Sequence, residues 1–235
     1  MHAYAQSTVR LAKAEDRVTY LQKVMAWTFG GLFFASLAGV GMAIFLSYVP
    51  FLLQGYIPLI VILGCFGIAN YVAPKMVFGS SKLPGFLLGN VAQGLAMGYL
   101  LLTAFYAGGM SGEPFGMIGT ALAMTALTAG GILAYVMSGP KDFSFLGGVL
   151  AAVSLPMFVL MGVTFVMPSL FGGPLGIALC GLFVIVSAGM LMWEMNKVVY
   201  ELRTDQHIEG SYMLSISILV LFWNILSLIL SMSRD

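Results

Sequence analysis

The residue of this sequence best suited to chemistry is Glu194, in the stretch SAGMLMWEMNKVVY. It is a carboxylate within an otherwise apolar segment, where burying a charge costs about 3 kcal/mol unless a partner or water receives it. Such an acid is by default a candidate for ion passage or pH sensing. Lys197 follows one helical turn later, so a Glu194–Lys197 ion pair at the edge of the segment is the alternative.

Amide side chains are the other polar groups in apolar segments: Asn70, Asn90, Gln93, Asn196 and Asn224. Amides in such places usually form hydrogen bonds between helices. Lining a path for ions or water is the second interpretation. Gln93 and Asn224 lie well inside long segments, so we group them with Glu194 as candidate residues of an ion path or pH sensor.

Enzyme signatures are absent from the sequence, which contains no HExxH, GxSxG, phosphate loop or cysteine pair. Cys65 and Cys180 lack the spacing of a metal site and predict no disulfide. His207 lies in the run YELRTDQHIEG, whose alternating charges predict a solvated loop and an exposed histidine. We therefore expect no catalytic, metal or cofactor-binding residues, no cofactor and no nucleic-acid partner.

The composition indicates which elements carry these residues. Hydrophobic residues make up 60% of the 235 residues and charged residues 8%, and the mean hydropathy is +1.00. Soluble domains are about 25% charged, and a helix needs roughly 20 apolar residues to span a bilayer. The runs do not alternate as barrel strands do. We predict an all-α membrane protein with seven transmembrane helices: 24–49, 56–73, 86–108, 116–137, 143–167, 175–200 and 211–231.

Lysine and arginine predict the orientation in the bilayer. Nine of the ten fall in the N-terminal region or in alternate loops, and only Arg234 falls on the other side. Because basic loops stay in the cytoplasm, we expect residues 1–20 to form a cytoplasmic tail, residues 21–235 to form the seven-helix transmembrane domain, and the C-terminus to lie outside. The first apolar segment is expected to be an uncleaved signal anchor.

Small residues and one proline predict local packing. Gly31, Ala35 and Gly39 share a helix face, and Gly94 with Gly98 forms a GxxxG pattern. These patterns favour close helix packing within the chain, with a dimer interface as the alternative. Pro156 predicts a kink in segment 143–167.

Four stretches resemble the Bax inhibitor (transmembrane Bax inhibitor motif) family, particularly its bacterial members. They are the entry to the first helix (RVTYLQKVMAWTFGGLFFASL), the third helix (LLGNVAQGLAMGYLLLTAF), the connection SGPKDFSFLGG, and the last two helices (SAGMLMWEMNKVV and YMLSISILVLFWNILSLIL). The resemblance covers nearly the whole chain. It implies a seven-helix bundle with the last helix near the centre, in the bacterial inner membrane.

The resemblance also implies candidate functions. Members are linked to a pH-sensitive calcium leak, and bacterial relatives to modulation of a membrane-anchored quality-control protease. In the leak members, two aspartates on the last two helices share protons. The first falls on Glu194 here and the second on Leu221, which cannot titrate; the family's third-helix acid falls on Gln93, and no arginine of the second segment is available to pair with Glu194.

Two functions follow as expectations. The first is a pH-sensitive path for calcium or another cation around Glu194, with calcium as a permeant ion only. The alternative is a regulatory protein that sits in the lipid bilayer and binds a membrane protease or another membrane protein, without conducting ions. An intramembrane hydrolase is disfavoured because no nucleophile is present.

Overall fold

The computed structural model describes residues 8–110, 112–139, 143, 146–150, 152–153, 159 and 173–233. Every element of the described chain longer than a single bridge is helical. The α-helices are α1 (Ala14–Tyr48), α2 (Ile57–Gly67), α3 (Ala73–Val77), α4 (Lys82–Met110), α5 (Gly116–Met137), α7 (Gly173–Asn196) and α8 (His207–Met232). A 3-10 turn, η1 (Pro50–Leu53), follows α1. Two π-helical turns, η2 (Ile68–Val72) and η4 (Lys197–Glu201), follow α2 and α7.

Six stretches of the described chain are long and apolar enough to cross a membrane. They overlap six of the seven predicted segments, because α2, η2 and α3 together form the second span and α7 with η4 forms another. The predicted segment 143–167 lies largely outside the described residues, as does Pro156. The prediction of an all-helical membrane protein is therefore confirmed, with six spans described.

The ends of the helices follow from local chemistry. Proline at position 50 has no amide hydrogen to donate, and α1 ends two residues before it. Gly55 and Gly112 take left-handed backbone angles, with φ of 58° and 81°, in the turns after η1 and α4. At the other end, α1 begins at Ala14, with Glu15 and Asp16 in its first turn beside the positive end of the helix dipole.

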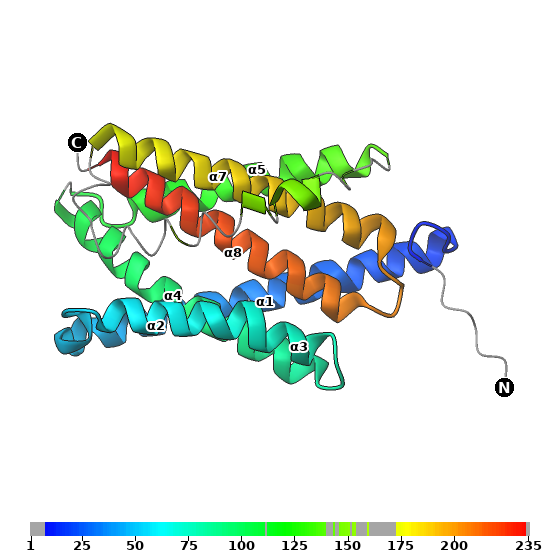
Figure 1. The fold of residues 1–235 in the computed structure, drawn as a ribbon, viewed down its shortest axis with the longest axis horizontal. Coiled ribbons are helices and arrows are strands. Elements are labelled where there is room, and N and C mark those ends of the chain that lie inside the picture. Colours follow the sequence, from blue (N-terminus) through cyan, green and yellow to red (C-terminus); the bar gives the residue numbers. More distant parts are fainter. Residues whose placement is uncertain are drawn as a thin grey trace.

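Helices α4 and α8 form the interior of the bundle (Figure 1). Buried residues make up 67% of the apolar stretch of α4 and 56% of that of α8, but only 11–22% in the other four spans. Helix α8 contacts α1, α3, α4, α5 and α7. The position of α8 agrees with the central last helix that the resemblance implies. The burial of α4, which is at least as great, was not predicted.

Small residues bring α1 and α4 together. A side chain at Gly94 would collide with the backbone of Ala35, and one at Gly39 would lie 3.1 Å from the carbonyl oxygen of Gly94. A side chain at Gly31 would come within 2.8 Å of Asn90 Oδ1. The small-residue faces are thus occupied by packing within the chain, as predicted.

Three helices that are distant in sequence run in the same direction. Glu209 at the start of α8 meets Lys82 at the start of α4, and the Ser211 hydroxyl donates to the carbonyl of Val24 in the first part of α1. Helix α7 runs the opposite way, because Glu194 near its end meets Ser217 while Phe183 lies beside Asn224 further along α8. We call the end where α1, α4 and α8 begin the charged end.

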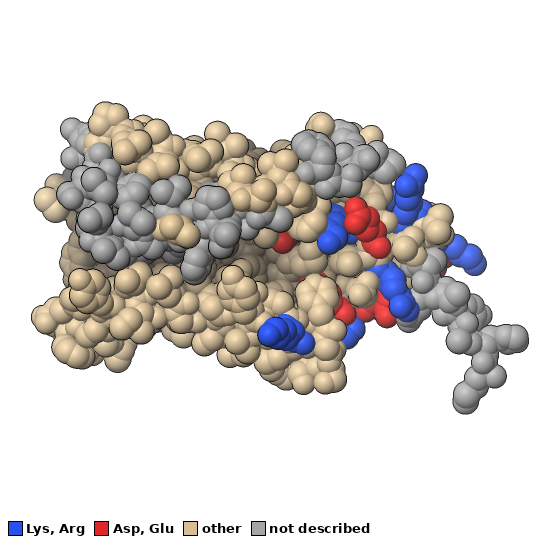
Figure 2. All heavy atoms as spheres, in the orientation of Figure 1, with Lys and Arg blue, Asp and Glu red and all other residues tan. Residues whose placement is uncertain are grey.

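Charged side chains gather at the charged end of the bundle (Figure 2). The described lysines and arginines all lie in helices that begin or finish there or in the segments next to them: Arg10, Lys13, Arg17, Lys23, Lys75, Lys82, Lys197 and Arg203. The described basic residues of the group predicted from the sequence therefore share one end of the bundle, and Lys141 lies outside the described residues.

Candidate functional site

Glu194 is buried where α7 meets α8. Its side chain is 7% exposed, and one carboxylate oxygen, Oε2, accepts a hydrogen bond from the hydroxyl of Ser217. Ser217 is itself buried. A hydrogen bond to a charged group is stronger than one between neutral groups, so this contact offsets part of the cost of burying the carboxylate.

Lys197 lies close to Glu194 in sequence but directs its ammonium group elsewhere. Its Nζ atom is 4.3 Å from the ring centroid of Trp193, a cation–π contact. The ion pairs among the described residues are Lys82–Glu209 and Arg203–Asp205, and neither includes Glu194. Lys197 remains an electrostatic neighbour of the carboxylate without touching it.

Gln93 lies in the interior of the bundle, fully buried on α4. It is one turn beyond Gly89, which packs against Tyr212 of α8, and Ser217 lies five residues beyond Tyr212. Because α4 and α8 run in the same direction, Gln93 and Ser217 lie at about the same level of the bundle. Neither Oε1 nor Nε2 of Gln93 has a hydrogen-bond partner.

Asn224 does not join this group. It lies seven residues, or about 10 Å, beyond Ser217 along α8, and its Nδ2 atom donates a 3.4 Å hydrogen bond to the carbonyl of Phe183 on α7. Leu221, where the resemblance places the second family carboxylate, is fully buried between these two levels. The structure thus brings Glu194 and Gln93 to one level and leaves Asn224 at another.

The remaining amides bond locally rather than between helices. Asn70 and Asn90 donate to the carbonyls of Phe66 and Phe86, one turn earlier on their own helices. Asn196 donates a 3.4 Å hydrogen bond to Glu201 in the adjoining π turn. Of the five predicted amides, Asn224 forms a bond between two helices.

A second buried carboxylate, Glu209, was missed by the sequence analysis. The run around it was predicted to be a solvated loop, yet α8 begins at His207 and Glu209 is only 3% exposed. Its Oε1 atom lies 2.7 Å from Nζ of Lys82, while Oε2 has no partner. His207 is half-buried beside this pair rather than exposed.

The reason for this error is that the partners of Glu209 come from other helices. Lys82 is on α4, and the nearby Tyr20 is on α1. Alternating charges also fit an exposed loop, so the run itself gave no signal of burial. The spacing of Glu209 before the apolar run of α8 was the available signal, because acids are favoured in the first turn of a helix.

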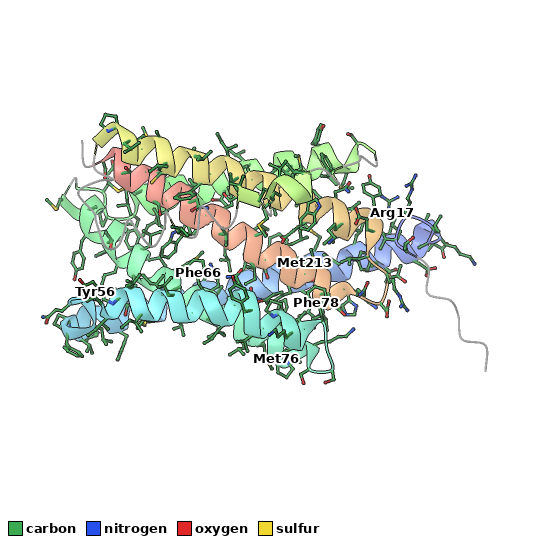
Figure 3. The ribbon with its side chains drawn as sticks, viewed as in Figure 1. Arg17, Tyr56, Phe66, Met76, Phe78 and Met213 are labelled. Atoms are coloured by element: carbon green, nitrogen blue, oxygen red, sulfur yellow. The ribbon has the colours of Figure 1, made fainter. Side chains whose placement is uncertain are left out.

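The N-terminal segment is bound to the end of α7 and the loop that follows. The amide of Val9 donates a 2.8 Å hydrogen bond to the carbonyl of Leu202, and Val9 is fully buried. Arg17, labelled in Figure 3, lies 5.2 Å from the ring centroid of Tyr200. Tyr20 donates to the carbonyl of Val198. These contacts order residues 8–20 against the charged end.

Seven buried side-chain atoms of the described residues have no hydrogen-bond partner: Thr28 Oγ1, Asn90 Oδ1, Gln93 Nε2, Gln93 Oε1, Tyr99 Oη, Asn196 Oδ1 and Glu209 Oε2. Leaving one such group unpaired costs about 1–3 kcal/mol. Seven of them would cost an amount comparable to the whole stability of a domain, about 5–15 kcal/mol. Five of the seven atoms belong to Thr28, Asn90, Gln93 and Glu209, in the part of the bundle that also holds Glu194.

The described part of the chain contains no cluster of three or more histidine, cysteine or acidic side chains that could hold a metal ion. Cys65 and Cys180 are free thiols. What the described geometry offers is one hydrogen-bonded carboxylate, one amide at its level and, at the charged end, the buried Glu209 paired with Lys82.

Comparison with known proteins gives a consistent family match. Residues 17–235 match the family model described as inhibitor of apoptosis-promoting Bax1. The chain is 29% identical over 144 residues to the modulator of FtsH protease YccA of Escherichia coli K12, covering 59% of this chain and 61% of that protein. The same values apply to the inner membrane protein YccA of a second Escherichia coli strain.

A third relative is an uncharacterized membrane protein of Vibrio cholerae. It is 27% identical over 179 residues, covering 76% of this chain and 77% of the relative. The chain thus spans less than two thirds of the Escherichia coli relatives but about three quarters of the Vibrio one. No solved structure matches the chain.

Proposed function

Because the chain belongs to the Bax inhibitor family, a family of non-enzymatic membrane proteins, we propose that it is a regulatory protein of the bacterial inner membrane that binds and modulates a membrane-anchored quality-control protease. The observation that carries the proposal is the similarity to a relative described as a modulator of FtsH protease. A relative described as an inner membrane protein supports the location.

The charged end supplies a surface for such a partner. Residues 8–20 are held against the end of α7 by Val9 and Arg17, while Leu11 is 78% exposed between them. An ordered segment with an exposed apolar side chain loses little conformational freedom on binding. We expect the partner to contact this segment.

Affinity purification tests the interaction. The tagged chain is produced in its host, solubilised in mild detergent and assayed for the host's FtsH-type protease by immunoblot. The unaltered chain should retain the protease, and Leu11→Asp should reduce retention several-fold because it places a charge in the contact without altering a buried group. Met110→Asp is the matched control, since Met110 is 91% exposed at the opposite end.

Turnover of a membrane substrate of the protease gives the functional readout. Overproduction of the unaltered chain should change the substrate's half-life, and Leu11→Asp should lessen that change while Met110→Asp should not. Failure of the unaltered chain to retain the protease or to change turnover would contradict the proposal. Equal retention of the protease by both variants would show that the contact does not involve Leu11 and lies outside the N-terminal segment.

For the topology, we propose seven crossings, with residues 1–20 and the charged end in the cytoplasm. Helix α5 finishes at the charged end, where the carbonyl of Val136 accepts a hydrogen bond from Tyr200, and α7 begins at the opposite end. An odd number of crossings between them accounts for both positions. The basic residues of the charged end support the orientation. Alkaline phosphatase fused after Met232 should be active, and inactivity there would contradict the outside C-terminus.

A second candidate function is a path for calcium or protons around Glu194. A buried carboxylate bonded to Ser217, with the unpartnered Gln93 at its level, supports it. In proteoliposomes loaded with a calcium dye, the unaltered chain should conduct and Glu194→Gln should not. Absent flux, or equal flux in both, would contradict this function. Leu221→Asp restores the second family carboxylate and should increase the flux.

A further inference from the structure

Unpartnered polar atoms are concentrated in one interface. Five of the seven lie on α1, α4 and α8, in the half of the bundle next to the charged end: Thr28 Oγ1, Asn90 Oδ1, both amide atoms of Gln93, and Glu209 Oε2. The four side chains are at least 96% buried. Buried polar groups in native proteins are nearly always satisfied by protein or by ordered water.

These side chains occupy successive levels between the charged end and Glu194. Glu209 lies beside Lys82 at the start of α4. Asn90 lies beside Gly31 of α1, and Thr28 is one turn before Gly31 on the same buried face. Gln93 follows at the level of the Ser217–Glu194 contact. Lys82 and Gln93 are about 16 Å apart along α4.

Beyond Gln93, the same helices bury apolar groups. Helix α4 buries Ala96 and Met97, and α8 buries Leu221, Leu226 and Leu230. Tyr99 of α4 is the polar exception, and it packs in a separate apolar cluster with Leu46, Ile62 and Leu102. An apolar interface gives water no hydrogen-bond partners, so it stays dry. The row of polar groups therefore begins at the charged end and finishes near Glu194.

We propose that the α1–α4–α8 interface binds a chain of internal water molecules, which runs from Glu209 past Thr28 and Asn90 to Gln93 and gives Glu194 contact with water from the charged end only. Each internal water typically makes about three hydrogen bonds, and the unpartnered atoms supply both donors and acceptors. The inference concerns the interior of the bundle and does not depend on the protease or on ion conduction.

Two threonines provide a matched test. Thr28 and Thr125 are 4% and 5% exposed, but the hydroxyl of Thr125 donates to the carbonyl of Ala121 at 2.7 Å whereas Thr28 has no partner. In water-edited solid-state NMR of the threonine-labelled protein in lipid bilayers, magnetisation should pass from water to Thr28 several-fold faster than to Thr125. Thr28→Val and Thr125→Val assign the two signals.

Equally slow transfer to both threonines would overturn the proposal. A second measurement is the unfolding temperature of Thr28→Val in detergent. If water satisfies the Thr28 hydroxyl, the variant should unfold at the same temperature or lower. If the hydroxyl is dry and unpaired, removing it should raise the unfolding temperature by about 2–4 °C, which would count against the water chain.

Discussion

The two halves of α8 bury different kinds of side chain. The half that begins at the charged end buries polar residues (Glu209, Ser211, Ser215 and Ser217) among apolar or aromatic ones (Tyr212, Leu214 and Ile216), whereas the half that leads away buries apolar residues alone: Leu219, Leu221, Phe222, Ile225, Leu226 and Leu230. Helix α4 buries the amides Asn90 and Gln93 first and then mainly apolar residues, Ala96, Met97 and Leu102, with Tyr99 among them. The apolar half of α8 thus stabilises its packing in the bundle, which allows the other half to bury the polar residues of the site.

The close contact between α1 and α4 extends through both the polar and the apolar half of the bundle. Breaking it should lower the stability of the protein more than any other change considered below. Gly94→Leu forces a side chain into the backbone of Ala35, which should cost about 3 kcal/mol or more. We expect loss of the folded protein in size-exclusion chromatography and a much lower unfolding temperature. Gly41→Leu is the control, since a side chain there meets nothing within 4 Å. Equal loss in both would contradict the packing.

Within the polar half, the Lys82–Glu209 pair should give the next largest effect. Lys82→Met leaves Glu209 buried and unpaired, which should cost about 3 kcal/mol. Glu209→Leu should cost less, because Lys82 is 40% exposed and can reach water. The double variant should recover stability relative to Lys82→Met alone. Thermal unfolding of the four proteins measures this, and strictly additive losses would show that the two side chains do not interact.

Ser217→Ala tests the contact to Glu194. Removing the hydroxyl should cost about 1.5–3 kcal/mol if the carboxylate is charged. Ser187→Ala is a matched control on α7, because Ser187 is also buried but its hydroxyl bonds within its own helix to Val184. A larger loss for Ser187→Ala than for Ser217→Ala in thermal unfolding would contradict a special role for the Glu194 contact.

The smallest effect is expected in the apolar half, at Asn224. Its hydrogen bond to Phe183 is long, at 3.4 Å, and the side chain is only half-buried. Asn224→Leu should therefore change the free energy of unfolding by less than about 0.5 kcal/mol. Its calcium flux in proteoliposomes should equal that of the unaltered chain. A lost or altered flux would place Asn224 on the path with Glu194.

The spans could be predicted from sequence because a bilayer demands long apolar runs. The segment predicted at 116–137 coincides with α5, and the others overlap described spans with shifted ends. Shifts arise where helices continue into polar residues: α1 begins at Ala14 and α4 at Lys82. Hydropathy does not report these extensions, since backbone hydrogen bonds continue beyond the apolar part.

The site was predicted only in part, because burial depends on partners from other helices. Glu194 and Gln93 were identified as polar groups inside apolar runs. Thr28 was not identified, since the hydroxyl of a threonine in a membrane helix usually bonds to a carbonyl of its own helix and so predicts no special role. Glu209 was assigned to a solvated loop because Lys82 is more than 120 residues away in the chain.

The side-by-side placement of the first and last described helices has a consequence for biosynthesis. Tyr20 and Val24 of α1 find their hydrogen-bond partners in Val198 and Ser211, which lie 178 and 187 residues later in the chain. Helix α1 is therefore synthesised before Val198 and Ser211, and it lacks these two hydrogen bonds while the intervening segments are inserted into the membrane. The contact between Val24 and Ser211 can form only after the start of α8 has been synthesised.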